Sequence, residues 1–206
     1  QLRQAVVSLV GNASDALDKA RYQALVETDL EGQELEAGIT ITADKVNGRL
    51  IIEDTGIGMT HEEAAKNLGT IAHSGTLRFL EEAAKREAEG KKPDVSLIGQ
   101  FGVGFYSVFM VADKVDVFSR SGHKGSEAVH WSSTGAGEFT LNATARETRG
   151  TRIEIQLKDE AKDYLEHYRV GHIIKRYSNF VMYPVMYQSI EEEGKDPTDP
   201  MQLNEA

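Results

Sequence analysis

The first 26 residues of the chain carry apolar side chains at helical spacing. From Leu2 to Leu25, leucine, valine and alanine recur every three or four positions, with polar residues between them. This period is typical of an amphipathic helix with one buried face.

The next periodic segment has the pattern of a β-hairpin. Residues 39–42 alternate between apolar and polar, and residues 50–52 are apolar and lead to Asp54. Asn47-Gly48 stands between them, and this pair tolerates a positive φ. The pattern predicts two antiparallel strands, the second of which ends at Asp54.

The remainder of the chain mixes helices with short strands. Thr60 and Glu63 have the spacing of a capping box, which predicts a helix from there through Leu68. Periodicity and turn residues predict further helices at about 77–88, 105–111 and 159–180, and strands at 114–119, 128–132, 138–143, 151–157 and from about 184. We therefore expect an α+β fold, a two-layer sandwich with a mostly antiparallel mixed sheet and helices on one face.

Length and charge restrict the classes of function. A chain of 206 residues can form one well-buried domain or two small ones, and no stretch has the length of a membrane span. The net charge of −10 repels nucleic-acid backbones, so we expect neither a nucleic-acid nor a membrane partner. The absence of cysteine fits a reducing compartment such as the cytoplasm.

The C-terminal residues differ in composition from the rest. We expect one domain over residues 1–190 and an acidic, proline-broken linker over residues 191–206. On composition alone, a disordered C-terminal tail is an equal alternative.

Two glycine clusters carry the main chemical signal. Asp54 to Met59 places one carboxylate at a strand end, next to glycines that let a flat ligand approach the backbone. Gly99 to Gly104 places bare amides before a helix, where they can bind a polyphosphate. Together they predict a nucleotide-binding domain in which Asp54 accepts a hydrogen bond from the exocyclic amine of adenine. Taken alone, Asp54 also fits a turn residue that opens the loop.

The first helix has a polar face that could contribute to the same site. Asn12, Asp15, Ala16 and Lys19 share one face of it. An amide oxygen is a suitable ligand for Mg²⁺, which takes its other ligands from phosphates and water. The alternative is an ordinary solvent-facing stripe.

A loop of small residues could close over the ligand. Residues 69–75, together with residues 90–104, are candidates for a lid that excludes water, or else are an ordinary surface loop. His73 has no second histidine or cysteine at ligand spacing, so a metal role is not expected.

Five motifs, in one order along the chain, resemble the N-terminal ATP-binding domain of the heat-shock protein 90 chaperone family, and most of all its bacterial branch, high-temperature protein G. The motifs are Gly11–Leu17, Asp54–Thr60, Asn67–Gly75, Ile98–Ser107 and Gly150-Thr151. The residues of the third motif, Asn67–Gly75, separate the chain from DNA gyrase B, MutL proteins and sensor histidine kinases, which share the nucleotide fold.

The resemblance implies a Bergerat-type ATP-binding fold and a role for each matching residue. Asn12 would hold Mg²⁺ against the phosphates of ATP or ADP, and Asp54 would bond the adenine amine, with Thr151 supporting it through a water. The other implied nucleotide contacts are Asp15, Ala16, Lys19, Gly58, Met59, Asn67, Leu68, Gly102, Val103, Gly104 and Phe105.

The resemblance also implies a larger assembly. Family members are homodimers that clamp client proteins and work with co-chaperones, and nucleotide closes the lid and the clamp. The family's opening strand and first helix have no counterpart in this chain, and residues 191–206 match its interdomain linker.

One position departs from the family. A glutamate that polarises the attacking water is expected one helical turn before Asn12, and Ser8 stands there. A hydroxyl of very high pKa is no general base, so hydrolysis should slow by roughly 10²–10⁴-fold. Three functions stay open: an ATPase domain of a chaperone, a nucleotide sensor that does not hydrolyse ATP, and a DNA-acting relative.

Overall fold

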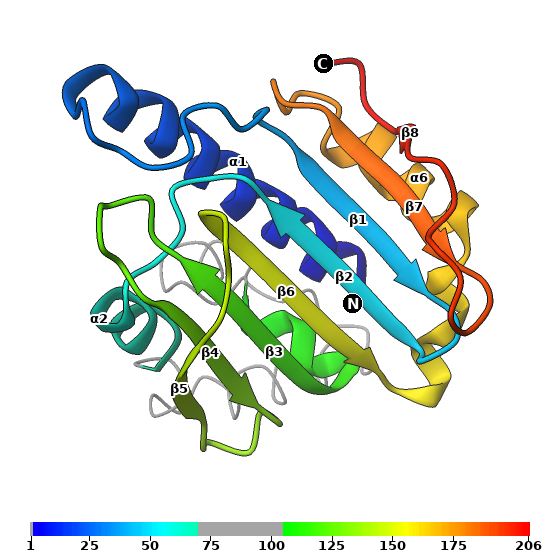
Figure 1. The fold of residues 1–206 in the computed structure, drawn as a ribbon. Helices are drawn as coiled ribbons and strands as arrows, with labels where there is room; N and C mark the ends of the chain where they lie inside the picture. Colours follow the sequence, from blue (N-terminus) through cyan, green and yellow to red (C-terminus); the bar gives the residue numbers. More distant parts are fainter. Residues whose placement is uncertain (1, 70–104) are drawn as a thin grey trace, which may run out of the picture.

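The computed structural model describes residues 2–69 and 105–206, and these form two layers, a sheet with helices on one face (Figure 1). The strands are β1 (Ile39–Asp44), β2 (Arg49–Asp54), β3 (Ala112–Arg120), β4 (Ala128–Ser133), β5 (Thr140–Thr144), β6 (Gly150–Leu157), β7 (Val185–Ile190) and β8 (Met201–Gln202). Their order in the sheet is β5-β4-β3-β6-β2-β1-β7-β8. Among the strands that the structure describes, only β1 and β7 pair in parallel, which confirms the expected α+β class.

The helix layer is built mainly on α1 (Leu2–Val26), as the periodicity predicted. The shorter helices are α2 (His61–Ala64), the π-helical η1 (Ala65–Gly69), the 3₁₀ helices η2 (Tyr106–Met110) and η3 (Asp159–Leu165), and α6 (His167–Tyr177). The apolar face of α1 is fully buried against the sheet, for example at Val6 and Leu9. In the part of the chain that the structure describes, no helix is long and apolar enough to cross a membrane.

The predicted hairpin and capping box are both present. β1 and β2 pair antiparallel with Ile39 opposite Asp54, and Gly48 has the positive φ of 66° that the turn requires. Thr60 and Glu63 each bond the other's backbone amide at the start of α2. Asp54 is therefore held at a defined strand end, with α2 beginning a few residues later.

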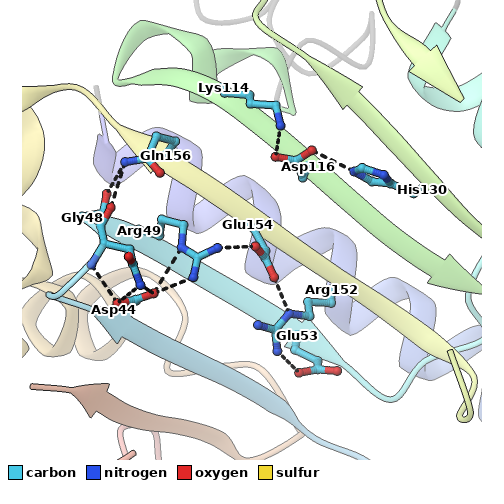
Figure 2. A network of polar contacts seen from close by, with 11 residues as sticks. Asp44, Gly48, Arg49, Glu53, Lys114, Asp116, His130, Arg152, Glu154 and Gln156 are labelled. Atoms are coloured by element: carbon cyan, nitrogen blue, oxygen red, sulfur yellow. Dashed lines mark hydrogen bonds and ion pairs between the residues drawn. The ribbon is translucent and has the colours of Figure 1, made fainter. Parts of the chain in front are cut away.

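The strands place charge on one face of the sheet and apolar residues on the other. Figure 2 shows the charged face, where Arg49 pairs with Asp44 at 2.7 Å and with Glu154 at 2.9 Å. Arg152 continues this row to Glu53 at 3.4 Å. Because successive strand residues point to opposite faces, the neighbours of these charges point towards the helices. Asp54 follows Glu53 and so faces the helix layer.

The predicted helix at 159–180 is wrong as a single element. The chain forms η3 and then α6, with the extended residue Glu166 (φ −73°, ψ 128°) between them. Leu165 and Val170 are both buried, but they are five residues apart, and a continuous helix would turn residues 168 and 169 to the core instead. The extended residue shifts the phase so that Val170 can pack.

The C-terminal segment returns to the sheet. Residues 191–200 are exposed, but β8 then pairs with β7, and Leu203 and Asn204 are buried. The Asn204 side chain accepts a hydrogen bond from the Val185 amide at 2.8 Å and donates to the Tyr183 carbonyl at 2.9 Å. Residues 201–204 therefore pack on the domain rather than extend into solvent, because one amide side chain satisfies backbone groups that composition does not reveal.

Candidate functional site

A cavity of about 200 Å³ lies between the helix layer and the ends of β2 and β6. Its walls come from α1, from the loop after β2, from the segment α2–η1 and from β6. The lining residues are Asn12, Ala16, Lys19, Asp54, Ile57, Gly58, Met59, Glu63, Asn67 and Thr151.

A short polar row across three adjacent strands forms the floor of the cavity and continues beneath it. Asp54 of β2 pairs with Thr151 of β6, and Thr151 pairs with Ser119 of β3. All three are buried on the helix side of the sheet, where the rest of each strand is apolar. Polar side chains in such a place cost free energy unless they find partners, so this row stands out from the core around it.

The loop after Asp54 follows its path because two positions lack a side chain. A Cβ on Gly56 would lie 2.7 Å from both the Ala16 Cβ and Oδ1 of Asp54. A Cβ on Gly58, which has φ of +69°, would lie 1.9 Å from the Arg120 carbonyl oxygen. Glycine thus lets the loop touch α1 on one side and β3 on the other.

Backbone hydrogen bonds hold this loop on both sides. The Ile57 amide donates to the Ala16 carbonyl of α1 at 3.0 Å, and the Gly122 amide donates to the Ile57 carbonyl at 2.8 Å. The buried guanidinium of Arg149 donates to the Gly56 carbonyl at 2.7 Å. The cavity wall is therefore tied to both layers of the domain.

Of the two described carboxyl groups that line the cavity, Asp54 and Glu63, Asp54 lies at the floor and is only 5 % exposed. Its Oδ1 accepts a hydrogen bond from the Gly56 amide at 2.8 Å. Burial raises the pKa of Asp54 to about 7, and the opposing effects of the Gly56 hydrogen bond and the Arg146 charge only partly offset it. Near neutral pH the group is thus poised between an acceptor-only carboxylate and a protonated donor.

The structure brings most of the expected nucleotide contacts to this one cavity. Those that line it are Asn12, Ala16, Lys19, Asp54, Gly58, Met59, Asn67 and Thr151. Asp15 is exposed on α1 and is not among the lining residues. Leu68 and Phe105 are buried in the core, where the Phe105 ring packs edge-on against Trp131, and neither lines the cavity.

Other expected features lie outside the described residues. These are Gly102, Val103 and Gly104, the predicted helix at 77–88, and the candidate lid apart from Gly69. Ser8 is half-buried on α1, one turn before Asn12, and does not line the cavity.

Asn12 is the residue that could contact a metal held by phosphates. Its side chain is exposed at the cavity and offers one amide oxygen. Across residues 2–69 and 105–206, no three His, Cys, Asp or Glu side chains gather into a metal site. A single protein oxygen fits Mg²⁺ that keeps its waters and takes further ligands from a nucleotide.

Three residues at or beneath the cavity were not predicted as site residues from the sequence. Ile57 and Glu63 line the cavity, and Ser119 extends the polar row beneath it. Glu63 was recognised only as a capping residue. Ser119 could have been noticed as a small polar residue on the apolar side of its strand's alternation, after Val115 and Val117.

Comparison with known families identifies the domain. Residues 1–146 match the family described as histidine kinase-, DNA gyrase B- and HSP90-like ATPases. The chain belongs to this ATPase family. The match takes in α1, the hairpin and β3 to β5, and so includes every described cavity residue except Thr151.

Individual relatives of this ATPase domain agree with the resemblance to HSP90 chaperones. The chain is 51 % identical over 177 residues to the chaperone protein HtpG of Chlorobaculum tepidum, which is 86 % of the chain and 28 % of the relative. It is 46 % identical over 186 residues to HtpG of Myxococcus xanthus, which is 90 % of the chain and 28 % of that relative. It is 45 % identical over 192 residues to HtpG of Coxiella burnetii strain RSA 331, which is 93 % of the chain and 30 % of that relative. The chain spans less than a third of the length of these relatives.

The pKa of Asp54 predicts an unusual pH dependence of stability. The folded state holds the Asp54 proton up to a pH of about 7, whereas the ordinary pKa is 3.8, so between these values the folded state binds more protons. The contribution of this group to the free energy of unfolding is therefore fully present below its ordinary pKa of 3.8. It is lost as the pH rises through the folded-state pKa of about 7. We expect Asp54→Asn to gain stability relative to wild type between pH 5 and 8, by on the order of a few kcal/mol.

Urea unfolding of the nucleotide-free protein across this pH range measures the effect. Glu53→Gln is the matched control, because Glu53 is the preceding residue on the charged face and pairs with Arg146 at 2.9 Å. Parallel pH profiles for wild type and Asp54→Asn would show that Asp54 is ionised in the folded state throughout the range.

Proposed function

We propose that this chain is the ATP/ADP-binding domain of an ATP-dependent molecular chaperone that assists protein folding. The observation that carries the proposal is the position of Asp54, a single buried carboxyl group at the floor of a cavity in an ATPase-family domain. The relatives named as HtpG chaperones support the class of the whole protein.

Adenine recognition follows from the hydrogen-bonding capacity of the floor. An ionised Asp54 only accepts hydrogen bonds, so it favours a base that presents an amine at this point. Thr151, its neighbour on β6, would support the same contact through a water. A base without the amine leaves a buried acceptor unpaired, which is costly away from solvent. Gly58 and Met59 provide a flat, adaptable wall for the ring.

The remainder of the nucleotide would lie along the cavity rim. Asn67 and Lys19 line the cavity and are exposed, which suits them to the sugar and to the negative charge of phosphates. The amides of Gly102, Val103, Gly104 and Phe105 are the proposed phosphate cradle. Asn12 would hold Mg²⁺, which when bound neutralises phosphate charge.

Hydrolysis needs a group that Ser8 does not provide. A water attacking the terminal phosphate must be oriented and must lose a proton, and a serine hydroxyl cannot take that proton at neutral pH. The chain would therefore bind ATP well and turn it over slowly.

Ser8 also favours a second function, that of a nucleotide sensor. In this alternative, ATP binding closes the lid and changes partner binding without turnover. A DNA-acting role, as in DNA gyrase B, is disfavoured by the net charge of −10.

The partners of the whole protein belong to the same proposal. We expect a cytoplasmic homodimer in which nucleotide drives lid closure and clamp dimerisation around client proteins, with co-chaperones adjusting the cycle. Residues 1–190 would be the nucleotide domain, and residues 191–206, of which 201–204 pack back on that domain, would lead towards a middle domain.

Replacing the cavity carboxylate tests nucleotide binding. Asp54→Asn should abolish detectable ADP binding in calorimetry, because the Gly56 amide would hold the new amide oxygen and the NH₂ group would then meet the adenine amine donor to donor. The fold should persist, since the amide has nearly the same volume. Glu53→Gln, altered on the opposite face of the same strand, should bind ADP as wild type does. Equal ADP affinity in wild type and Asp54→Asn would refute the role given to Asp54.

Restoring a carboxylate tests the hydrolysis proposal. Ser8→Glu should raise single-turnover ATP hydrolysis by about 10²-fold or more, because it supplies the missing base on the face that carries Asn12. Gln4→Glu is the matched control, since it adds the same charge one turn further along α1 and should have no effect. No gain from Ser8→Glu would remove Ser8 from the reaction and favour the nucleotide sensor.

A further inference from the structure

Ser119 lies beneath the cavity and is completely buried, yet neither the motifs nor the cavity walls include it. Its hydroxyl has three neighbours. The Met59 amide donates to Ser119 Oγ at 2.9 Å, the Gly150 carbonyl oxygen is 3.2 Å from it, and Oγ1 of Thr151 is 2.9 Å from it. Ser119 therefore contacts the wall residue Met59 and the floor residue Thr151 at once.

The number of protons decides how these contacts can be made. A serine hydroxyl donates one hydrogen bond and accepts two. The Met59 amide occupies one acceptor position, and the Gly150 carbonyl can only accept, so the single proton of Ser119 satisfies that carbonyl. With that proton assigned to Gly150, the Thr151 contact takes one of its two possible directions, in which Thr151 donates to Ser119. This arrangement gives a partner to every group in the cluster, as buried polar groups require.

The consequence appears on the other side of Thr151. With its only proton directed at Ser119, the Thr151 hydroxyl presents lone pairs alone to the cavity. Ionised Asp54 next to it also presents acceptors alone. The whole polar floor thus accepts hydrogen bonds and donates none.

From this cluster we infer that Ser119 is a positioning residue which holds the Thr151 hydroxyl as an acceptor, so that the cavity selects amino-purine over oxo-purine nucleotides. The inference rests on the proposed nucleotide-binding function and adds to it the group that sets base specificity. Ser119 acts only through Thr151 and Met59, since it does not itself line the cavity.

The ratio of ADP to IDP affinity measures this role. IDP carries a carbonyl oxygen where ADP carries the amine, so an all-acceptor floor repels it. In Ser119→Ala the Thr151 proton loses its acceptor and can turn into the cavity to bond that oxygen. We expect the ADP-to-IDP affinity ratio, measured by calorimetry, to fall about tenfold. Ser119→Thr, which keeps the hydroxyl, should retain the wild-type ratio.

Two further variants separate positioning from a general loss of structure. Ser133→Ala is the matched control, because Ser133 is a buried strand serine that also donates to a carbonyl, that of Glu138, at 2.6 Å. It should leave the ratio unchanged. The double variant Ser119→Ala/Thr151→Val should have the same ADP-to-IDP affinity ratio as Thr151→Val alone. The hydroxyl through which Ser119 acts is already absent from Thr151→Val.

The outcomes distinguish this inference from the proposed function. If wild type binds ADP in preference to IDP and Ser119→Ala keeps the same ratio, the role of Ser119 is overturned while nucleotide binding stands. The inference would also be overturned if adding Ser119→Ala to Thr151→Val lowered the ADP-to-IDP affinity ratio as much as Ser119→Ala does alone. If wild type fails to bind ADP, the proposed function is wrong and the specificity role is overturned with it.

Discussion

The central constraint in this domain is the burial of one carboxyl group at the end of a strand. Asp54 is 5 % exposed, on the side of the sheet that otherwise forms the hydrophobic core. Burial raises its pKa to about 7, so its charge is held at a cost that the protein's own hydrogen bonds do not fully offset. A ligand that donates to this carboxylate offsets the remainder, and this couples binding to protonation.

The surrounding structure keeps that carboxyl group in place. Gly56 and Gly58 allow the following loop to contact α1 and β3, and Arg149 binds the loop carbonyls. On the other face of β2 and its neighbours, charged residues pair with one another (Figure 2). Asp44 is fully buried in its pair with Arg49, whereas Arg152 and Glu53 are both partly exposed and their pair contributes little stability. The two faces of β2 thus differ, with paired charges on one and the cavity carboxyl group of Asp54 on the other.

Local patterns in the sequence predicted the local parts of the fold. Helix α1, the β1–β2 hairpin and the capping box at Thr60 each depend on residues close together in the chain, and all three are present. The parallel pairing of β1 with β7 and the return of β8 to the sheet edge join distant segments, and no local pattern encodes them. The break at Glu166 was missed because apolar spacing on both sides of it is helical.

The same distinction holds for the cavity. Asp54 and Asn12 lie in compact motifs that predicted a shared site, and both residues line the same cavity. Ser119 belongs to no motif, and its importance comes only from the register that sets it beside Thr151. Leu68 and Phe105, which were expected among the nucleotide contacts, are buried and are not among the residues that line the cavity in this structure. Motifs therefore predicted which polar residues line the cavity better than which apolar residues do.

The most direct test of the central claim is the pKa of Asp54 with and without ADP. Carbon-13 labelling of the aspartate carboxyl groups allows NMR to follow this group, with Asp54→Asn assigning its signal. The account predicts a pKa of about 7 in the free protein and a clear fall when ADP binds, because the adenine amine stabilises the carboxylate. A pKa that stays the same or rises on ADP binding would contradict it.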